Sequence, residues 1–95
     1  MPAPLLTVIV PSYNSQDYLD RAMTSLVGYG DEVEVVIVDD GSKDATGGIA
    51  DDWASRYDSV RVIHQENKGH GGAVNAGLAA ATGTHVRVVD SDDWL

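Results

Sequence analysis

Apolar and polar positions divide the chain into four strand-like runs separated by three helix-like stretches. The runs, in which valine and isoleucine dominate, cover residues 5–10, 33–38, 60–63 and 86–89. Between them, residues 19–27, 49–57 and 74–81 repeat apolar side chains every three or four positions, which is the spacing of one helix face. Strands that alternate with helices predict an α/β fold, βαβαβαβ, in which helices cover both faces of a parallel sheet.

The helical spacing also identifies the side chains that we expect to face the sheet. They are Leu19, Ala22, Met23, Leu26 and Val27 in the first stretch, Ile49, Trp53 and Tyr57 in the second, and Val74, Gly77, Leu78 and Ala81 in the third. Because glycine is favoured just past a helix, we expect Gly28 or Gly30 to end the first helix and Gly83 the third.

The composition of the strands predicts their order. The first two are almost unbroken apolar runs, as is typical of central strands buried on both faces, whereas Arg61 places the third at an edge. Right-handed crossovers then favour the order 3-2-1-4 in a three-layer, Rossmann-like sheet, with the switch point between the first and fourth strands. Ligands of such sheets bind beyond the carboxyl ends of the strands, where the polar clusters of this sequence lie.

Length and composition narrow the class of partner. The 95 residues suffice for one small domain, and a formal net charge of −9 argues against nucleic acid or an anionic membrane, which attract basic patches. Cysteine is absent, which excludes disulfides, thiolate zinc sites and cysteine nucleophiles. The first residues carry no basic stretch of the signal-peptide kind and no apolar run approaches membrane-spanning length, so we expect a cytoplasmic location.

Acidic residues follow the fourth strand as Asp90-Ser91-Asp92-Asp93. Residues i and i+2 of an extended chain point the same way, so Asp90 and Asp92 can reach one cation. Mg²⁺ or Mn²⁺ typically takes one or two carboxylates and completes its shell with water and phosphate oxygens. The alternative, an acidic turn that caps the next helix, stays open on the spacing alone.

A second acidic pair, Asp39 and Asp40, ends the second strand in the same layer. A carboxylate there can accept hydrogen bonds from a ribose hydroxyl or a base N–H, much as in dinucleotide-binding folds. Gly41 permits a tight turn, and we assign Ser42 or Asp44 the role of capping the next helix.

Two further clusters are candidates for ligand contact. Tyr13 follows Pro11 at the switch point, where its ring can stack on a nucleobase or pack against the first helix. Residues 67–72 are glycine-rich and precede the third helix, so their amides and Lys68 can meet phosphate. The segment lacks the third glycine of the dinucleotide fingerprint, and we interpret His70 as an exposed loop histidine.

These segments together resemble glycosyltransferase family 2, the inverting family with the GT-A fold. The resemblance rests on VIVPSYN at residues 8–14, VIVDDGSKD at 36–44, NKGHGGAVNAGL at 67–78 and DSDD at 90–93. Each motif is weak alone, but four in family order cover almost the whole chain.

The resemblance implies roles for the nucleotide-binding residues. Pro11 and Tyr13 would line the base pocket, with Tyr13 against uracil. Asp40 would contact the base, and Asp39 would contact or support the nucleoside.

The resemblance likewise implies that Asp92 or Asp93 holds Mg²⁺ or Mn²⁺ and that a neighbouring carboxylate meets ribose. Asp90 is therefore a candidate for both roles. Asn75 and Gly77 match an Asn-x-Gly that shapes the pocket, and Val74 stands where the family often has a basic residue. Lys68 is a candidate substitute for that residue.

The activity implied is transfer of a sugar from a nucleotide-diphospho-sugar, with a UDP-sugar favoured, to an acceptor hydroxyl with inversion. The acceptor, whether a polysaccharide, a lipid-linked glycan or a protein glycan, stays open, and such enzymes often work beside a membrane. The family's general base lies well downstream of the Asp-x-Asp. We therefore expect residues 1–95 to form one nucleotide-sugar-binding half-domain, a truncated GT-A fold that transfers no sugar alone.

The alternative is a catalytically inactive nucleotide-binding or self-associating module. The fourth strand would lie at a sheet edge, and among residues 86–89 only Arg87 carries a charge. Because such edges pair readily with another chain, we expect a homodimer through this strand.

Overall fold

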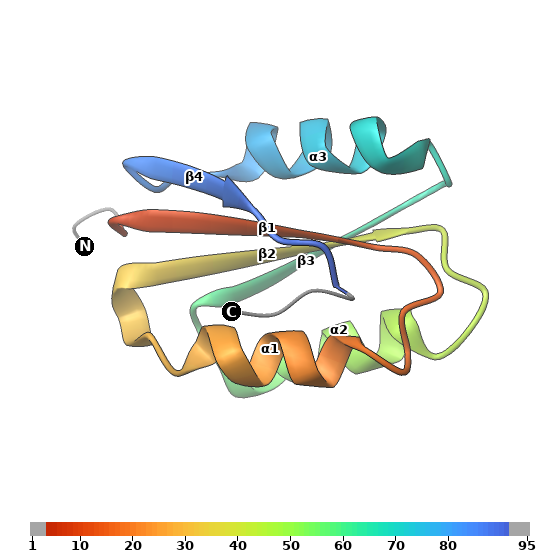
Figure 1. Cartoon of the computed structure of the whole chain (residues 1–95), viewed down its shortest axis with the longest axis horizontal. Helices are drawn as coiled ribbons and strands as arrows, with labels where there is room; N and C mark the ends of the chain where they lie inside the picture. The colour runs from red at the N-terminus through yellow and green to blue at the C-terminus, as the bar shows by residue number, and fades with distance from the viewer. Residues whose placement is uncertain (1–3, 92–95) are drawn as a thin grey trace.

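The computed structural model of the chain describes residues 4–91, which form a parallel sheet between two helical layers (Figure 1). One face of the sheet is covered by α3 and the other by α1 and α2 (Figure 1). In chain order the elements are β1 (Leu6–Ser12), α1 (Leu19–Val27), the 3-10 helix η1 (Gly30–Glu32), β2 (Val33–Asp40), α2 (Thr46–Arg56), β3 (Val60–Gln65), α3 (Gly69–Ala80) and β4 (His85–Val88).

The strands pair in the order β3-β2-β1-β4, and every pairing is parallel, which confirms the predicted topology. Val10 of β1 lies opposite Ile37 of β2, and Leu6 lies opposite His85 of β4. β1 and β2 are buried along almost their whole length, so the two Val/Ile runs are the central strands. The switch point between β1 and β4 therefore lies where the sequence predicts it.

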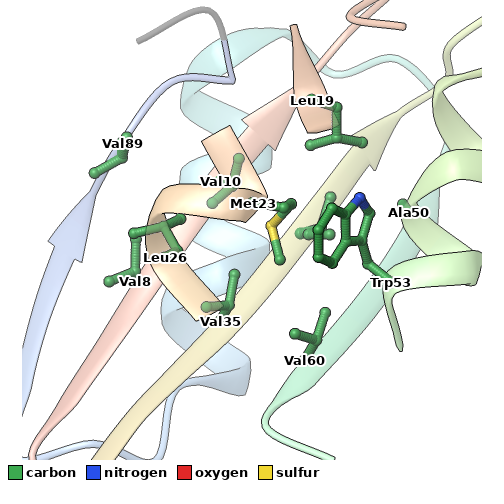
Figure 2. Close-up of a cluster of buried hydrophobic side chains, with 11 residues drawn as sticks. Val8, Val10, Leu19, Met23, Leu26, Val35, Ala50, Trp53, Val60 and Val89 are labelled. Carbon is green, nitrogen blue, oxygen red and sulfur yellow. The ribbon is translucent and has the colours of Figure 1, made fainter. Parts of the chain in front are cut away.

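The larger apolar cluster lies between the sheet and the α1–α2 layer (Figure 2). The predicted face of α1 is buried there through Leu19, Ala22, Met23 and Leu26. Trp53 of α2 is also buried, and its Nε1 donates a hydrogen bond to Asp20 Oδ1 at 2.7 Å. Burial stabilises each large apolar side chain by about 1.5–3 kcal/mol, so this cluster holds α1 and α2 on the sheet.

Small residues join α3 to the opposite face. Ala73 packs in a cluster with Ile9 and Val36, and Gly77 is the other buried residue of the helix. A Cβ on Gly77 would lie 2.3 Å from Ile9 Cγ2, so a glycine is needed for this close approach. The predicted helix face is wrong at Leu78, which is 48% exposed, because the small residues rather than the large ones turn toward the sheet.

Several element boundaries also differ from the prediction. α3 begins at Gly69, so the glycine-rich segment forms its first turn rather than a loop before it. Tyr57 lies just past α2 and stacks on Trp53, with ring centroids 5.7 Å apart. β2 continues through Asp40, so both acidic residues belong to the strand. No helix among residues 4–91 is long and apolar enough to cross a membrane.

Candidate functional site

A hollow of about 340 Å³ opens at the carboxyl ends of the strands, next to the switch point. It is formed by the end of β1 and the loop after it, the last residue of β2, the start of α3 and the residues after β4. The lining consists of Pro11, Ser12, Tyr13, Asn14, Ser15, Tyr18, Asp40, His70, Ala73, Asp90 and Ser91. This volume is at the lower end of the range of small-molecule sites, so the hollow suits one ring system and its substituents.

Hydrogen bonds between two loops hold the β1 side of the hollow in place. Asn14 N donates to Ser42 Oγ at 3.0 Å, and Asn14 Oδ1 accepts from Lys43 N at 2.9 Å. Ser15 N donates to Thr46 Oγ1 at 2.7 Å. The loop after β1 is thus positioned by the loop after β2 and by the start of α2, because Asn14 is bonded to the first and Ser15 to the second.

The same contacts correct the predicted helix caps. Ala45 occupies the N-cap position of α2 without a side-chain capping bond, and Ser42 Oγ accepts from Asn14 instead. Asp44 accepts from Thr46 N at 2.9 Å and from Gln16 N at 3.3 Å. Burial alone would raise the pKa of Asp44, but hydrogen bonds from Thr46 and Gln16 outweigh it and lower that pKa. Asp44 therefore links the loop to the start of α2 as a carboxylate.

Asp40 reaches the hollow from the α3 face of the sheet. Its Oδ1 accepts from Gln65 Nε2 at 2.9 Å and from Lys68 N at 2.8 Å, and its Oδ2 accepts from Gly69 N at 3.0 Å. Burial would raise the pKa of Asp40, but these hydrogen bonds and the Lys68 charge lower it. A carboxylate oxygen has two lone-pair sites, so the ionised Asp40 keeps one acceptor site on Oδ2.

The Asp40 carboxylate also occupies two backbone amides of the glycine-rich segment. The amides of Lys68 and Gly69, which the sequence offers to a phosphate, are bonded to Asp40. An anion at this helix start is therefore already supplied by the protein. These two amides are therefore not free to meet a phosphate in this structure.

Asp39 points to the opposite face of the sheet, toward α2. Its Oδ1 accepts from Ser42 N at 3.0 Å, and its Oδ2 lies 2.9 Å from His64 Nδ1. A Cβ on Gly47 of α2 would lie 2.8 Å from the same Oδ2. Asp39 therefore supports the turn after β2 from behind and does not line the hollow.

The residues after β4 close the other side of the hollow. Asp90 Oδ1 lies 2.8 Å from His70 Nε2, so the start of α3 and the segment after β4 meet through these side chains. Ser91 is buried, and its Oγ lies 2.6 Å from Ser15 Oγ of the loop after β1. This segment is thereby tied to both flanks of the hollow.

Four of the residues singled out in the sequence meet in the hollow, namely Pro11, Tyr13, Asp40 and Asp90. They come from three different strand ends, as expected for a site at the carboxyl edge of a parallel sheet. Tyr13 is 47% exposed, so its ring is not packed into the core beside α1. Its ring is accessible to a ligand at the edge of the hollow.

The other predicted site residues lie elsewhere. Asp39, Lys68 and Asn75 are not part of the lining, although Lys68 acts on Asp40 through its backbone amide and its charge. Asn75 is exposed on α3. Asp92 and Asp93, the predicted metal ligands, lie outside the described residues.

Several lining residues were not anticipated as site residues. Ser12, Asn14 and Ser91 adjoin predicted residues in the sequence and Ser15 lies two positions after Tyr13, so their position at or just after a strand end is the available signal. Tyr18 lies on the far side of the first loop, which carried no such signal. The sequence indicates an exposed loop position for His70, and the side chain is exposed, but it lies in the first turn of α3 and lines the hollow. Its pairing with Asp90 depends on two elements that only the fold brings together.

The charged groups in the lining of the hollow are mainly acidic. The lining contains the Asp40 and Asp90 carboxylates, and His70 is the lining side chain that can carry a positive charge. An anionic ligand would be repelled here unless a cation accompanied it. Residues 4–91 contain no group of three His, Cys, Asp or Glu side chains placed to hold a metal ion. Asp40 is already bonded to three donors, so Asp90 is the lining carboxylate that is left for a cation. One carboxylate matches the one or two that Mg²⁺ takes when phosphate completes its shell.

Comparison with known sequences places this arrangement in a family. The model of the family "Glycosyl transferase family 2" matches residues 7–95. EpsJ of Bacillus subtilis, an uncharacterised glycosyltransferase, is 41% identical over 93 residues, which are 97% of this chain and 27% of EpsJ. The chain thus spans about a quarter of the length of EpsJ and of EpsH, a putative glycosyltransferase of the same organism.

Solved structures show the same fold. TarS 1–349 of S. aureus in complex with UDP superimposes with a TM-score of 0.84 at 37% identity, over 94% of this chain and 28% of TarS 1–349. The mannosyltransferase PcManGT of Pyrobaculum calidifontis, in complex with GDP-Man and Mn²⁺, has a TM-score of 0.86 at 30% identity, over 99% of this chain and 29% of PcManGT.

Proposed function

The chain belongs to glycosyltransferase family 2, and on this basis we propose that its hollow binds the nucleoside part of a nucleotide-diphospho-sugar, with a UDP-sugar favoured. The observation that carries the proposal is the meeting of Tyr13, Asp40 and Asp90 in one hollow at the carboxyl ends of the strands. TarS 1–349, which has this fold, has been solved with UDP and with UDP-GlcNAc.

Asp40 supports the choice of base. It is held as a carboxylate with one acceptor site left on Oδ2, so it suits a base edge that presents an N–H donor. The ring of uracil carries such a donor at N3, and so do thymine at N3 and guanine at N1, whereas cytosine has a lone pair at N3. The exposed ring of Tyr13 is available to stack on the same base.

Asp90 supports a divalent cation as part of the bound state. We propose that Asp90, together with Asp92 or Asp93, holds Mg²⁺ or Mn²⁺, and that Asp90 is also placed to meet ribose. The donor chemistry fits, because carboxylate oxygens are the ligands these cations prefer. Such a cation neutralises the charge of a diphosphate leaving group when it is bound. PcManGT has been solved with Mn²⁺ and GDP-Man, although another base is involved there.

For the whole protein we propose transfer of the sugar to an acceptor hydroxyl with inversion. This reaction needs a general base that deprotonates the acceptor. We assign that role to none of the lining residues, since Asp40 is bonded to three donors and Asp90 is paired with His70. Residues 4–91 accordingly serve the donor side of the reaction, and we propose that they transfer no sugar by themselves.

A second proposal concerns self-association through β4. Within the described residues β4 pairs on one side only, with β1. Val86 and Val88 are 42% and 40% exposed on this edge, and an apolar hollow of about 190 Å³ adjoins it. A second copy of the chain is the occupant that pairs the free backbone groups and covers this apolar surface at once.

Calorimetric titration tests the donor proposal. UDP, GDP, dTDP and CDP would each be titrated with and without Mn²⁺. We expect UDP to bind more tightly with the metal, and CDP to bind about tenfold more weakly than UDP, because CDP lacks the ring N–H that Asp40 accepts. Equal affinity for UDP and CDP would contradict the role of Asp40, and equal UDP affinity in Mn²⁺ and EDTA would contradict the metal.

A further inference from the structure

His64 joins two carboxylates behind the candidate site. It lies near the end of β3, and its Nδ1 is 2.9 Å from Asp39 Oδ2 while its Nε2 is 2.8 Å from Asp51 Oδ1. The three side chains come from β3, β2 and α2, so the contact ties the edge of the sheet to the helix above it. Gly47 makes room for it, since a Cβ there would lie 3.4 Å from His64 Cε1 and closer still to Asp39.

The geometry identifies the protonation state of this ring. A neutral imidazole has one N–H donor, whereas two carboxylates at hydrogen-bond distance require two donors. Both contacts are therefore satisfied only when His64 is an imidazolium. The charged groups that face the ring are Asp39 from β2 and Asp51 from α2. Hydrogen bonds to Asp51 and Asp39 raise the pKa of His64 above its ordinary value, against an opposing effect of burial.

A short chain of bonds connects this bridge to the hollow. Asp39 uses its second oxygen to accept from Ser42 N at 3.0 Å. Ser42 Oγ in turn accepts from the amide of Asn14, which lines the hollow. Gly41 lies between Asp40 and Ser42 and has φ 74°, a conformation that suits glycine. Because glycine restricts the backbone little, the turn relies on hydrogen bonds from other segments to keep Asp40 and Ser42 in position.

We propose that His64 is a positioning residue for nucleotide binding, which as an imidazolium bridges Asp39 and Asp51 and so holds the turn that carries Asp40 and docks on Asn14. The proposal rests on the proposed function for the identity of the ligand. It adds a dependence of affinity on pH that arises outside the hollow. Loss of the proton removes one of the two bonds, loosens the turn and weakens nucleotide binding as pH rises.

The test compares UDP affinity at about pH 6 and about pH 8.5 in the wild-type chain, His64→Gln and His85→Gln. His85 is exposed at the start of β4, remote from the hollow, and its substitution removes a histidine without touching the bridge. For the wild type and His85→Gln we expect the dissociation constant to rise about three- to tenfold with pH, less than a buried charged hydrogen bond would give, because His64 and Asp51 are about half exposed. His64→Gln should show less than half of this rise. An equal rise in His64→Gln would overturn the proposal, because this variant and the wild type differ at His64 alone.

A second measurement separates this proposal from the proposed function. Urea unfolding at the same two pH values, with ¹H–¹⁵N spectra of the histidine rings, needs no nucleotide. If UDP binds at neither pH, the proposed function fails and the positioning role of His64 fails with it. The spectra still confirm or refute the hydrogen-bonded bridge between His64, Asp39 and Asp51 in that case. A His64 pKa at or below that of free histidine would refute the bridge. Asp51→Asn, an exposed single-atom change, should lower the His64 pKa and reproduce the smaller pH effect on UDP binding if His64→Gln folds poorly.

Discussion

Asp39 and Asp40 are neighbours in β2, yet their carboxylates lie on opposite faces of the sheet. Asp40 accepts from Gly69 N at the start of α3, and Asp39 lies against Gly47 of α2 and bonds to His64. The two helices cover opposite faces (Figure 1), so one acidic residue can contact a ligand while the other supports the turn from behind. This division gives the two carboxylates different expected phenotypes.

Asp40→Asn should weaken UDP binding more than Asp39→Asn does. The amide nitrogen of the new residue is a donor. In place of Oδ1 it would face the donors of Gln65 and Lys68, and in place of Oδ2 it would face Gly69 N and remove the acceptor site left for the base. We expect a loss of about tenfold or more for Asp40→Asn, measured by calorimetry with Mn²⁺ at pH 7. An equal or greater loss for Asp39→Asn would contradict the assignment of Asp40 to the ligand side.

Asp90→Asn should reduce the gain in UDP affinity that Mn²⁺ provides. The substitution keeps the shape of the side chain but removes the charge that the cation needs. Asp58→Asn is the matched control, because it removes the same charge from an exposed residue at the other end of the sheet, before β3. Calorimetry of both variants in Mn²⁺ and in EDTA is the measurement. A full metal effect in Asp90→Asn would show that Asp90 is not a ligand.

Gly77→Ala should destabilise the fold. The added Cβ would lie 2.3 Å from Ile9 Cγ2, and over-packing of this kind typically costs about 1–3 kcal/mol in the free energy of unfolding. Gly48→Ala in α2 is the control, since no atom lies within 4 Å of its new Cβ. That change should stabilise the chain by about 0.4–1 kcal/mol. Urea unfolding compares the two, and a neutral Gly77→Ala would mean that α3 is not packed so closely.

The fold was predictable because burial and side-chain size agree in most elements. The Val/Ile runs of β1 and β2 are central strands, and the face of α1 beginning at Leu19 is the buried one. In α3 they disagree, since Gly77 faces the sheet and Leu78 faces solvent. Hydrophobic spacing identifies large buried residues and is blind to a helix that approaches through small ones.

The site was predictable only in part, for a similar reason. Position after a strand end identified Tyr13, Asp40 and Asp90, because every parallel strand delivers its next residues to the same edge. The alternation of side chains along β2 is sufficient to place Asp39 and Asp40 on opposite faces of the sheet. The pairing of His70 with Asp90 depends on where α3 begins. That start is stabilised by Asp40, which lies 29 residues earlier and bonds to the amide of Gly69.

Protonation of Glu34 should lower the stability of the fold at acid pH, as should protonation of Asp40 and Asp44. Burial would raise the pKa of Glu34, but bonds from Thr82 and Thr7 and the charge of Arg61 lower it. A carboxyl whose pKa is lowered by folding stabilises the fold above its unfolded pKa, and that contribution is lost as pH falls through the folded pKa. We therefore expect Glu34→Gln to lose less stability than the wild type between about pH 6 and pH 3. Exposed Glu66→Gln is the control, and identical pH profiles for all three in urea unfolding would contradict the role of Glu34.

Val88→Lys should shift a self-associated chain toward monomer. Val88 is 40% exposed on the β4 edge, and an inserted lysine there repels its copy across a symmetric contact. Ser55→Lys, which adds the same charge on the exposed side of α2, should leave the mass unchanged. Light scattering over a range of protein concentrations decides, and a wild-type chain that stays monomeric at the highest concentration would remove the β4 proposal.

The most direct test of the donor site is a ¹H–¹⁵N NMR titration of the chain with UDP and Mg²⁺. We predict saturable shifts of the amides that surround the hollow, those of Ser12, Asn14, Gly69 and Ser91 among them, and none at Asp58 or His85. CDP at the same concentrations should produce much smaller changes at Gly69, because cytosine presents a lone pair at N3 to Asp40 where uracil presents an N–H. An absence of saturable shifts, or shifts confined to residues outside the hollow, would contradict the conclusion that this edge of the sheet binds the nucleotide.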